Sequence, residues 1–435
     1  MRFGTAKDII TPIEPTMLAC AKYFDRTYTE IHDDLYVRTL VIDDGKSKAV
    51  LMSFDLIFHN RDLNREIAEY AHEKYGISPA AVVVTHTHSH PTPATPSYNP
   101  YNPMSVNPSF EALIRDRAKR CLDRAMLTMF EGSAEYGSFD ADFNVSRRGK
   151  VNGVYKISPA PDYICDKEFF VLCVKDTEGR IRNITCNYPC HPVFYPTEYM
   201  LSGEFPGRVS QLLESEYWSC VAMYTQSSAG DVRPRPCIKV KEDGTLKFQK
   251  LPFEAVDAFA KDMSSAVVSF IKKQEMKPID FSIAADEFSI RLEIEPKPIE
   301  AFAEKLEFER THNMPGNADW ENAKHALEGG YDEMPEHLDV WCQTLRLSDA
   351  LYVATIGGEP CFGVKNVIKY VFGGKDVCFI GYTDDCAYLV DDRVLAEGGY
   401  EPGCHIEYNL KGPFKSGLNT IYAEGFKASL ERINK

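Results

Sequence analysis

Three histidines at the end of an apolar, β-branched run constrain this chain more than any other feature. The run is Val82-Val83-Val84-Thr85-His86-Thr87-His88-Ser89-His90-Pro91, and it holds three of the 11 histidines in 435 residues. Such a run, ending at a proline, is typical of a buried strand that reaches its terminus. Side chains two residues apart share one face of a strand, so we expect His86 and His88 to project together. Two imidazoles at a strand end commonly begin a metal site.

Charge and composition argue against several classes of protein. The net charge of −15 repels phosphate backbones, so we expect no nucleic-acid partner. No apolar run is long enough for a transmembrane segment, and the first eight residues lack the apolar core of a signal peptide. The 13 cysteines form no CxxC pairs, which is typical of a reduced interior. We therefore expect a cytoplasmic protein that acts on a small molecule; the sequence leaves its oligomeric state open.

Strand-like and helix-like segments alternate along most of the chain. Asn60 is a candidate cap for a helix over 61–75 that ends before Gly76. A polar segment, 297–340, is expected to be a peripheral excursion of a single domain that spans 1–435. The alternation predicts an α/β fold with a mixed β-sheet core flanked by helices. Expected strands lie at 35–42, 48–55, 81–88, 132–139, 168–175, 181–188, 220–226, 281–295, 350–356 and 377–382, and further helices at 109–130, 206–217, 254–274 and 361–372.

Polar groups follow several other expected strands. His191 lies between two prolines after one expected strand. Glu359 follows another expected strand and two glycines. A carboxylate at that position is either a metal ligand, a general base or part of an ordinary turn. Small residues before Asp231 either let backbone amides approach a ligand or form a tight turn. From the residues alone, Asp384 or Asp385 is the expected ligand after the last strand.

Five segments, in order along the chain, resemble motifs of the catalytic domain of neutral/alkaline non-lysosomal ceramidases. The resemblance implies that family's α/β catalytic fold. Ceramidases continue into a C-terminal β-sandwich domain where this chain stops, so we expect no such domain here. The segments are Gly4–Pro12, Thr85–Ser89, Gln226–Pro234, Gly358-Glu359, and Tyr388 with Tyr400-Glu401 twelve residues later.

The resemblance also implies a ligand set and a catalytic set. It implies one zinc per chain, held by His86, His191, Glu359 and Tyr388, and this replaces the expectation of an aspartate ligand. The implied catalytic residues are His88, Tyr400 and one of the two adjacent arginines, Arg147 and Arg148. The implied substrate-binding residues are Gln226, Ser227, Gly230, Asp231, Arg233 and His90.

Two departures from the family motifs bear on the substrate. Arg233 replaces the serine of G-D-V-S-P, and His90 replaces the glycine after T-H-T-H-S. A long cation beside the metal favours an anionic or polar substrate over a sphingoid base. We therefore expect a zinc-dependent hydrolase that cleaves the C–N (amide) bond of a small polar or N-acyl substrate. The alternatives are a true neutral ceramidase and a non-catalytic metal-binding protein in which Arg233 blocks the substrate position.

Overall fold

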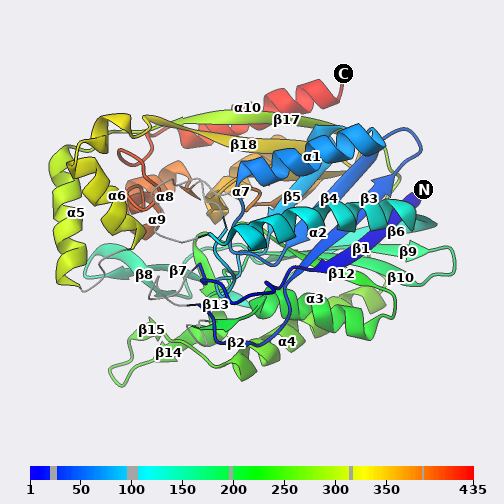
Figure 1. Cartoon of the computed structure of the whole chain (residues 1–435), viewed down its shortest axis with the longest axis horizontal. Coiled ribbons are helices and arrows are strands. Elements are labelled where there is room, and N and C mark those ends of the chain that lie inside the picture. The colour runs from blue at the N-terminus through cyan, green and yellow to red at the C-terminus, as the bar shows by residue number, and fades with distance from the viewer. Residues whose placement is uncertain (20–26, 96–105, 195–198, 313–316, 385–386) are drawn as a thin grey trace.

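Two β-sheets packed face to face form the centre of the structure (Figure 1), a computed structural model that describes residues 1–19, 27–95, 106–194, 199–312, 317–384 and 387–435. The larger sheet has the order β12-β10-β9-β6-β1-β3-β4-β5, and most of its neighbours are antiparallel. Its strands are β1 (Arg2–Ile9), β3 (Tyr36–Asp43), β4 (Lys48–Phe54), β5 (Val82–His86), β6 (Phe130–Asp140), β9 (Glu168–Asp176), β10 (Ile181–Tyr188) and β12 (Val221–Gln226), and the short β16 (Lys277–Pro278) also pairs with β6.

The smaller sheet covers one face of the larger one. Its order is β17-β18-β19-β21, with the last pair parallel. The layer between the sheets is apolar: Leu40 and Val83 of the larger sheet share one core cluster with Val353 and Ile380 of the smaller. The strands are β17 (Ala284–Glu293), β18 (His337–Arg346), β19 (Leu351–Ile356) and β21 (Asp376–Ile380).

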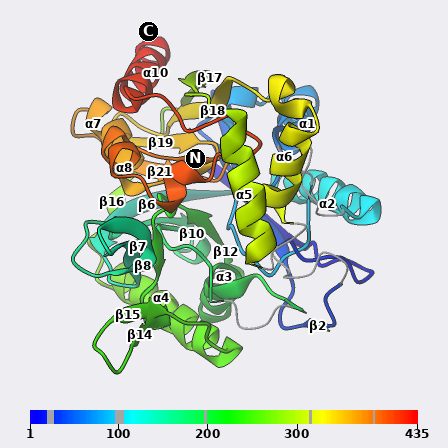
Figure 2. The same cartoon turned by 90° about the vertical axis from the view of Figure 1, so that its left-hand side faces the viewer.

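Helices cover the outer faces of both sheets. Helices α1 (Arg61–Tyr75) and α2 (Pro108–Leu127) pack on the half of the larger sheet around β3 and β4, and α3 (Glu204–Glu216) and α4 (Phe253–Lys272) pack on the half around β10 (Figures 1 and 2). Helices α7 (Phe362–Val371) and α10 (Leu418–Ile433) pack on the smaller sheet. The result is a four-layer arrangement, which confirms the predicted α/β class.

Close packing of α2 on β1 depends on one glycine. A β-carbon at Gly4 would collide with the carbonyl oxygen of Ala125 in α2. No other residue type has a side chain small enough for this approach. Gly4 lies in the first of the segments that resemble ceramidase motifs, so this part of the motif has a packing role.

The polar segment expected as an excursion contains a helical hairpin. Helices α5 (Ile299–Thr311) and α6 (Ala318–Leu327) lie side by side at one end of the molecule (Figure 2). Asn322 in α6 is fully buried and donates hydrogen bonds to the carbonyl oxygens of Ile406 and Glu407. These bonds connect the hairpin to the chain that follows α9 (Tyr400–Gly403). The last residues of the expected excursion, from His337, instead begin β18 in the smaller sheet.

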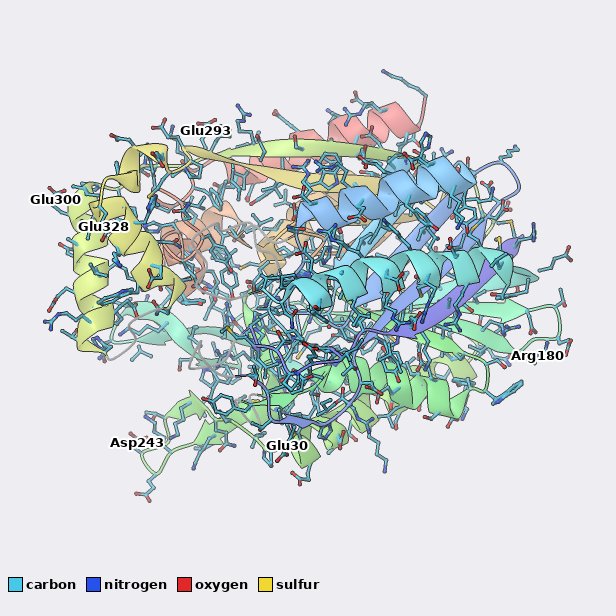
Figure 3. All side chains as sticks on the ribbon, viewed as in Figure 1. Glu30, Arg180, Asp243, Glu293, Glu300 and Glu328 are labelled. Atoms are coloured by element: carbon cyan, nitrogen blue, oxygen red, sulfur yellow. The ribbon has the colours of Figure 1, made fainter. Side chains whose placement is uncertain are left out.

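Acidic side chains lie at the margins of the molecule. Glu300 and Glu328 of the hairpin region and Glu293 at the end of β17 project outward (Figure 3). Across the described ranges, no helix has both the length and the apolar character needed to cross a bilayer. The 11 described cysteines are all unpaired, and all but Cys165 are buried.

The first prediction concerns the layer between the sheets. We expect Leu351→Ala to lower the free energy of unfolding by about 2–5 kcal/mol, because Leu351 is fully buried there and truncation leaves a cavity. The matched control is Leu127→Ala, whose side chain is 82% exposed and whose truncation should cost less than about 0.5 kcal/mol. Urea denaturation followed by circular dichroism measures both, and equal effects would contradict the packing described here.

Candidate metal centre

The polar motifs meet where several strands end. Strand β5 is parallel to β4, β10 to β12, and β19 to β21, so the carboxyl ends within each pair lie at the same edge. Backbone hydrogen bonds join these ends across the two sheets: His86 N donates to Tyr382 O (3.1 Å) and Gly381 N donates to Gln226 O (3.0 Å). Segments far apart in sequence are thereby brought around one point.

Three histidines converge at this point. One ring nitrogen from each of His88, His90 and His191 lies within 4.8 Å of the others. The Nε2 atoms of His90 and His191 are 3.0 Å apart. His88 and His191 are buried, and His90 is partly exposed. This spacing suits imidazoles that share a metal ion.

Backbone carbonyl groups orient two of these rings. His88 Nδ1 lies 2.8 Å from Ile57 O, and His191 Nδ1 lies 3.2 Å from Ala229 O. A carbonyl oxygen only accepts, so each Nδ1 is a donor, and Nε2 is the ring nitrogen left to bind a metal. Metal-binding histidines are typically held in this way, with the second ring nitrogen donating to a carbonyl or a carboxylate.

A carboxylate with one buried oxygen lies beside the cluster. Glu359 Oε2 lies 3.2 Å from His88 Nε2 and 3.9 Å from His191 Nδ1, yet it accepts no hydrogen bond. The other oxygen, Oε1, accepts a hydrogen bond of 2.7 Å from the hydroxyl of Tyr408. A buried carboxylate oxygen without a donor is costly unless a cation satisfies it, so the donor set fits a metal ion such as zinc.

Burial and neighbouring charges keep the cluster ready for a cation. Burial lowers the pKa of His191 well below its usual value, and His88 and Arg147 act in the same direction. Burial also lowers the pKa of His90, with a contribution from Arg233. Burial alone would raise the pKa of Glu359, but the positive charge of a protonated His88 and the hydrogen bond from Tyr408 hold it below its usual value. Neutral imidazoles beside a carboxylate are the protonation states that bind a metal.

His86, expected as a ligand, lies apart from this group. Its Nδ1 is 3.2 Å from Nδ1 of His59, and its ring centroid is 6.0 Å from that of His88. His88 has left the strand with φ of 61°, so it and His86 do not continue one regular strand face. Burial lowers the pKa of His59 to about 4, so this second histidine pair is uncharged near neutral pH.

Tyr388 lies beside the carboxylate. The short strands β20 (Glu359–Pro360) and β22 (Tyr388–Leu389) are parallel neighbours, with Glu359 directly opposite Tyr388. The ring of Tyr388 also contacts Tyr400 and Tyr408, at centroid distances of 5.6 and 6.0 Å. The hydroxyl of Tyr400, whose side chain is 37% exposed, donates to Glu407 (3.3 Å).

The two adjacent arginines occupy different surroundings. Arg147 lies against the rings of Tyr388 and Tyr400, 5.0 and 5.3 Å from their centroids, and its Nε donates to Glu401 (2.9 Å). Its Nη2 is buried and makes no hydrogen bond. Arg148 donates to Glu401 (2.5 Å) and to Glu397 (3.1 Å), so both carboxylates hold it away from the histidines. Of the two, Arg147 is the one that faces the site.

The segment expected to bind substrate makes its contacts within the protein. Gln226 donates to the carbonyl oxygens of Thr87 and Cys190. Ser227 donates to Asp166, and Gly230 N donates to Pro360 O. A β-carbon at Gly230 would lie 2.7 Å from Glu359 O, so the glycine permits this close approach. These residues link the histidine segments to the segment of Glu359.

Asp231 belongs to the same buried segment. Its Oδ1 accepts a hydrogen bond from Phe362 N (3.2 Å), and its backbone oxygen accepts one from Arg147 N (2.9 Å). Burial raises the pKa of the Asp231 carboxyl to about 7, and the nearby charge of Glu401 adds to the shift. The backbone of Asp231 thus helps to position Arg147, and the approach of a ligand to this segment stays a prediction.

Arg233 shares one face of a small sheet with Arg147. Strand β13 (Val232–Pro234) is antiparallel to β7 (Asn144–Val151), and Arg233 lies directly opposite Val145. Residues opposite each other share a face, as do residues two apart, so both guanidinium groups project from the same side. The Arg233 guanidinium also lies 5.0 Å from the ring centroid of Phe248.

Two site residues had no signal in the sequence. Tyr408 and His59 lie outside every segment in which a strand ends in polar residues. Tyr382 follows β21, and its ring lies 4.7 Å from that of His88, with its hydroxyl buried and unbonded. Of the two aspartates expected there, Asp384 is outside the histidine group, and Asp385 lies outside the described residues.

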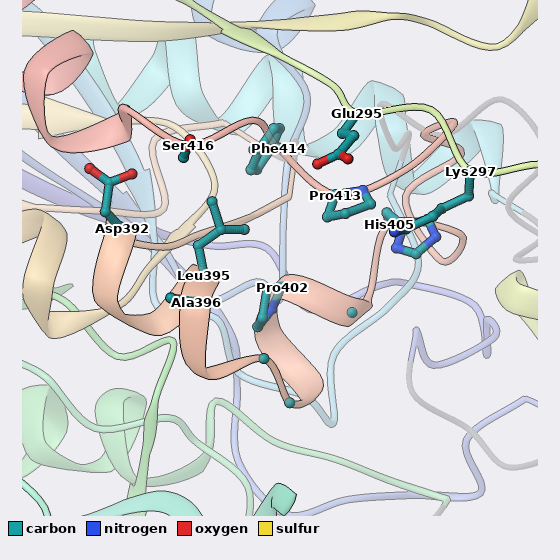
Figure 4. Close-up of a pocket in the computed structure, with 13 residues that line it drawn as sticks. Glu295, Lys297, Asp392, Leu395, Ala396, Pro402, His405, Pro413, Phe414 and Ser416 are labelled. Atoms are coloured by element: carbon teal, nitrogen blue, oxygen red, sulfur yellow. The ribbon is translucent and has the colours of Figure 1, made fainter.

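A separate cavity of about 480 Å³ lies behind α9 (Tyr400–Gly403) (Figure 4). Leu395, Pro402 and Phe414 give it an apolar lining, and His405 and Lys297 lie at one side. Its lining includes none of the three clustered histidines. The cavity is therefore distinct from the histidine cluster.

No known family model matches the sequence. The structure is similar to that of the neutral ceramidase from Pseudomonas aeruginosa, with a TM-score of 0.72 and 17% identity over 99% of this chain and 75% of that chain. A ceramidase structure described as complexed with C2 gives a TM-score of 0.73 and 16% identity over the same shares. At this identity the likeness establishes the fold. The resemblance drawn from the sequence motifs is thus confirmed at that level: this chain has the fold of the neutral ceramidases.

Proposed function

We propose that this protein is a zinc-dependent hydrolase of the ceramidase-like type, cleaving the C–N (amide) bond of a small polar or N-acyl substrate. One observation carries the proposal: the ring nitrogens of three histidines converge beside Glu359 Oε2, a buried carboxylate oxygen that accepts no hydrogen bond. A structural ion pair would satisfy that oxygen without assembling three imidazoles. The ceramidase fold adds support, because the cluster lies where strands of that fold end.

We assign the zinc ligands to His88, His191, Glu359 and Tyr388. The assignment differs from the expectation in one ligand, because His88 rather than His86 lies against Glu359. Support for Tyr388 comes from its position opposite Glu359 in paired strands. His90, whose Nε2 is 3.0 Å from that of His191, is left as the partly exposed group that faces the substrate side.

A zinc ion held there would polarise the substrate carbonyl and lower the pKa of a water molecule toward neutrality. The remaining tasks belong to the chain. Arg147 Nη2, which has no protein acceptor, donates to the oxyanion that develops on the substrate carbonyl. The ion pair with Glu401 and the flanking tyrosine rings hold that guanidinium in place. His90, neutral at the start, accepts the proton that the attacking water loses and passes it to the leaving amine as the C–N bond breaks.

Arg233 sets the substrate class under this proposal. Its position on the same sheet face as Arg147, together with its effect on the pKa of His90, supports a charge that faces the site. A guanidinium there pairs with a carboxylate or a polar group of the substrate. The alternatives are a true neutral ceramidase and a metal-binding protein without catalysis, in which Arg233 occupies the substrate position.

The second prediction tests the metal and its ligands. Purified wild-type protein should carry about one zinc per chain by elemental analysis. His88→Ala and Glu359→Gln should lose it, because each removes an atom that faces the cluster. His86→Ala is the matched control, since it removes a neighbouring histidine whose Nδ1 faces His59. Zinc lost from His86→Ala and kept by His88→Ala would return the ligand to His86.

The third prediction tests the role of Arg233 in substrate choice. For an N-acyl amino acid with a free carboxylate, we expect Arg233→Ser to lower kcat/KM by roughly 10- to 100-fold, the size of a charge-assisted hydrogen bond of about 1.5–3 kcal/mol. The same variant should lose little activity toward the carboxamide of that substrate. Steady-state kinetics on both compounds provide the measurement.

Arg235→Ser serves as the control for this experiment. Arg235 lies two residues away and pairs with Asp142 at the surface, where its side chain is 36% exposed. It should leave both activities unchanged. Hydrolysis of N-acyl-sphingosine by the wild type would favour the true ceramidase, and activity gained only in Arg233→Ser would favour a blocked site.

A further inference from the structure

A buried ion pair is linked by hydrogen bonds to a segment of the metal centre. Lys365 of α7 and Asp166 are 2% and 3% exposed, and Nζ of the lysine lies 2.5 Å from Oδ2 of the aspartate. Removing both charges from water costs free energy that their attraction seldom exceeds. Stability alone is therefore a poor account of why the pair is there, and its contacts indicate another role.

Asp166 is connected to His191 through the segment of Ser228 and Ala229. The same Oδ2 accepts hydrogen bonds from the hydroxyl groups of Ser228 (2.9 Å) and Ser227 (3.4 Å). The next residue is Ala229, whose carbonyl oxygen lies 3.2 Å from His191 Nδ1. One carboxylate oxygen thus fixes the segment that presents the orienting carbonyl to His191.

Lys365 belongs to α7, the helix that begins just after Glu359. Helix α7 begins at Phe362, three residues after Glu359. Its first amide, Phe362 N, donates to Asp231 Oδ1, and Gly230 N donates to Pro360 O. The ion pair therefore fastens the helix that follows Glu359 to the loop that holds His191.

We propose that Lys365 and Asp166 form a positioning pair for the metal centre, acting through Ser228 and Ala229 on the orientation of His191. The pair contacts neither substrate nor metal. This role rests on the proposed function, since it presumes that His191 binds a metal ion. Loss of such supporting contacts around a metal-binding histidine typically weakens metal affinity about 10- to 100-fold.

A neighbouring ion pair provides a matched control. Lys369, one turn further along α7, pairs with Glu168 at 2.7 Å, whereas the ion-pair partner of Asp166 is Lys365. Glu168 also accepts from Lys365, at 2.9 Å. Lys369→Met removes a cation from the same helix and the same network while leaving Asp166 and Ser228 joined.

The experiment compares zinc affinity and the cobalt absorption spectrum in wild type, Asp166→Ala, Asp166→Asn and Lys369→Met. Asp166→Ala should bind zinc about 10- to 100-fold more weakly in a chelator competition and shift the visible bands of bound Co²⁺. Asp166→Asn should recover most of the affinity, because its amide oxygen still accepts from Ser228 while Lys365 keeps Glu168. Lys369→Met should match the wild type.

Three outcomes would contradict the positioning role of Asp166 and Lys365. Wild-type affinity and spectrum in a folded Asp166→Ala would overturn the positioning role. If Asp166→Ala fails to fold by circular dichroism, the double variant Ser227→Ala/Ser228→Ala replaces it, because it removes both hydroxyl groups that link Asp166 to the loop. Unchanged zinc binding in that variant would overturn the role equally. A wild type that binds no zinc would instead overturn the proposed function, and this role with it.

Discussion

Two sheets can share one buried layer only if their strands present apolar side chains at alternate positions. Strand β19 does so: Leu351 and Val353 face the larger sheet, whereas Tyr352 and Ala354 face α7 and α10. Packing of both faces fixes where each strand ends. The hydrogen bonds from His86 N to Tyr382 O and from Gly381 N to Gln226 O then bring the ends of both sheets together. The metal centre depends on this packing, because no single sheet supplies more than part of the donor set.

Charge inside this layered structure is compensated locally. Glu401 faces Arg147 and Arg148, and Asp166 faces Lys365, in surroundings that are almost fully buried. Glu359 is different, because one of its oxygens has a tyrosine donor and the other has none. The contrast distinguishes buried charges that are already paired by the protein from one that is left for a cation.

Local patterns in the sequence predicted the elements whose signals are complete over a few residues. Helix α1 has the expected bounds, its side-chain cap at Asn60 accepts from Leu63 N, and Gly76 ends it in the left-handed conformation. Strand β18 was missed because it begins inside a polar stretch. Tyr408 could not be predicted either, since it reaches Glu359 through tertiary packing, and no local pattern encodes that contact.

The histidine run has a property that follows from its own spacing. Thr85-His86, Thr87-His88 and Ser89-His90 are three near-copies of one hydroxyl–imidazole pair, each displaced by the two-residue repeat of a strand. Shifting a motif alignment by two residues leaves every side chain on the same strand face. A motif comparison therefore cannot decide which histidine of the run corresponds to which histidine of the motif. In the structure the backbone removes this ambiguity, because the chain turns to a positive φ at His88 and separates His88 from His86. Repetition in the sequence thus conceals a position that the turn makes unique.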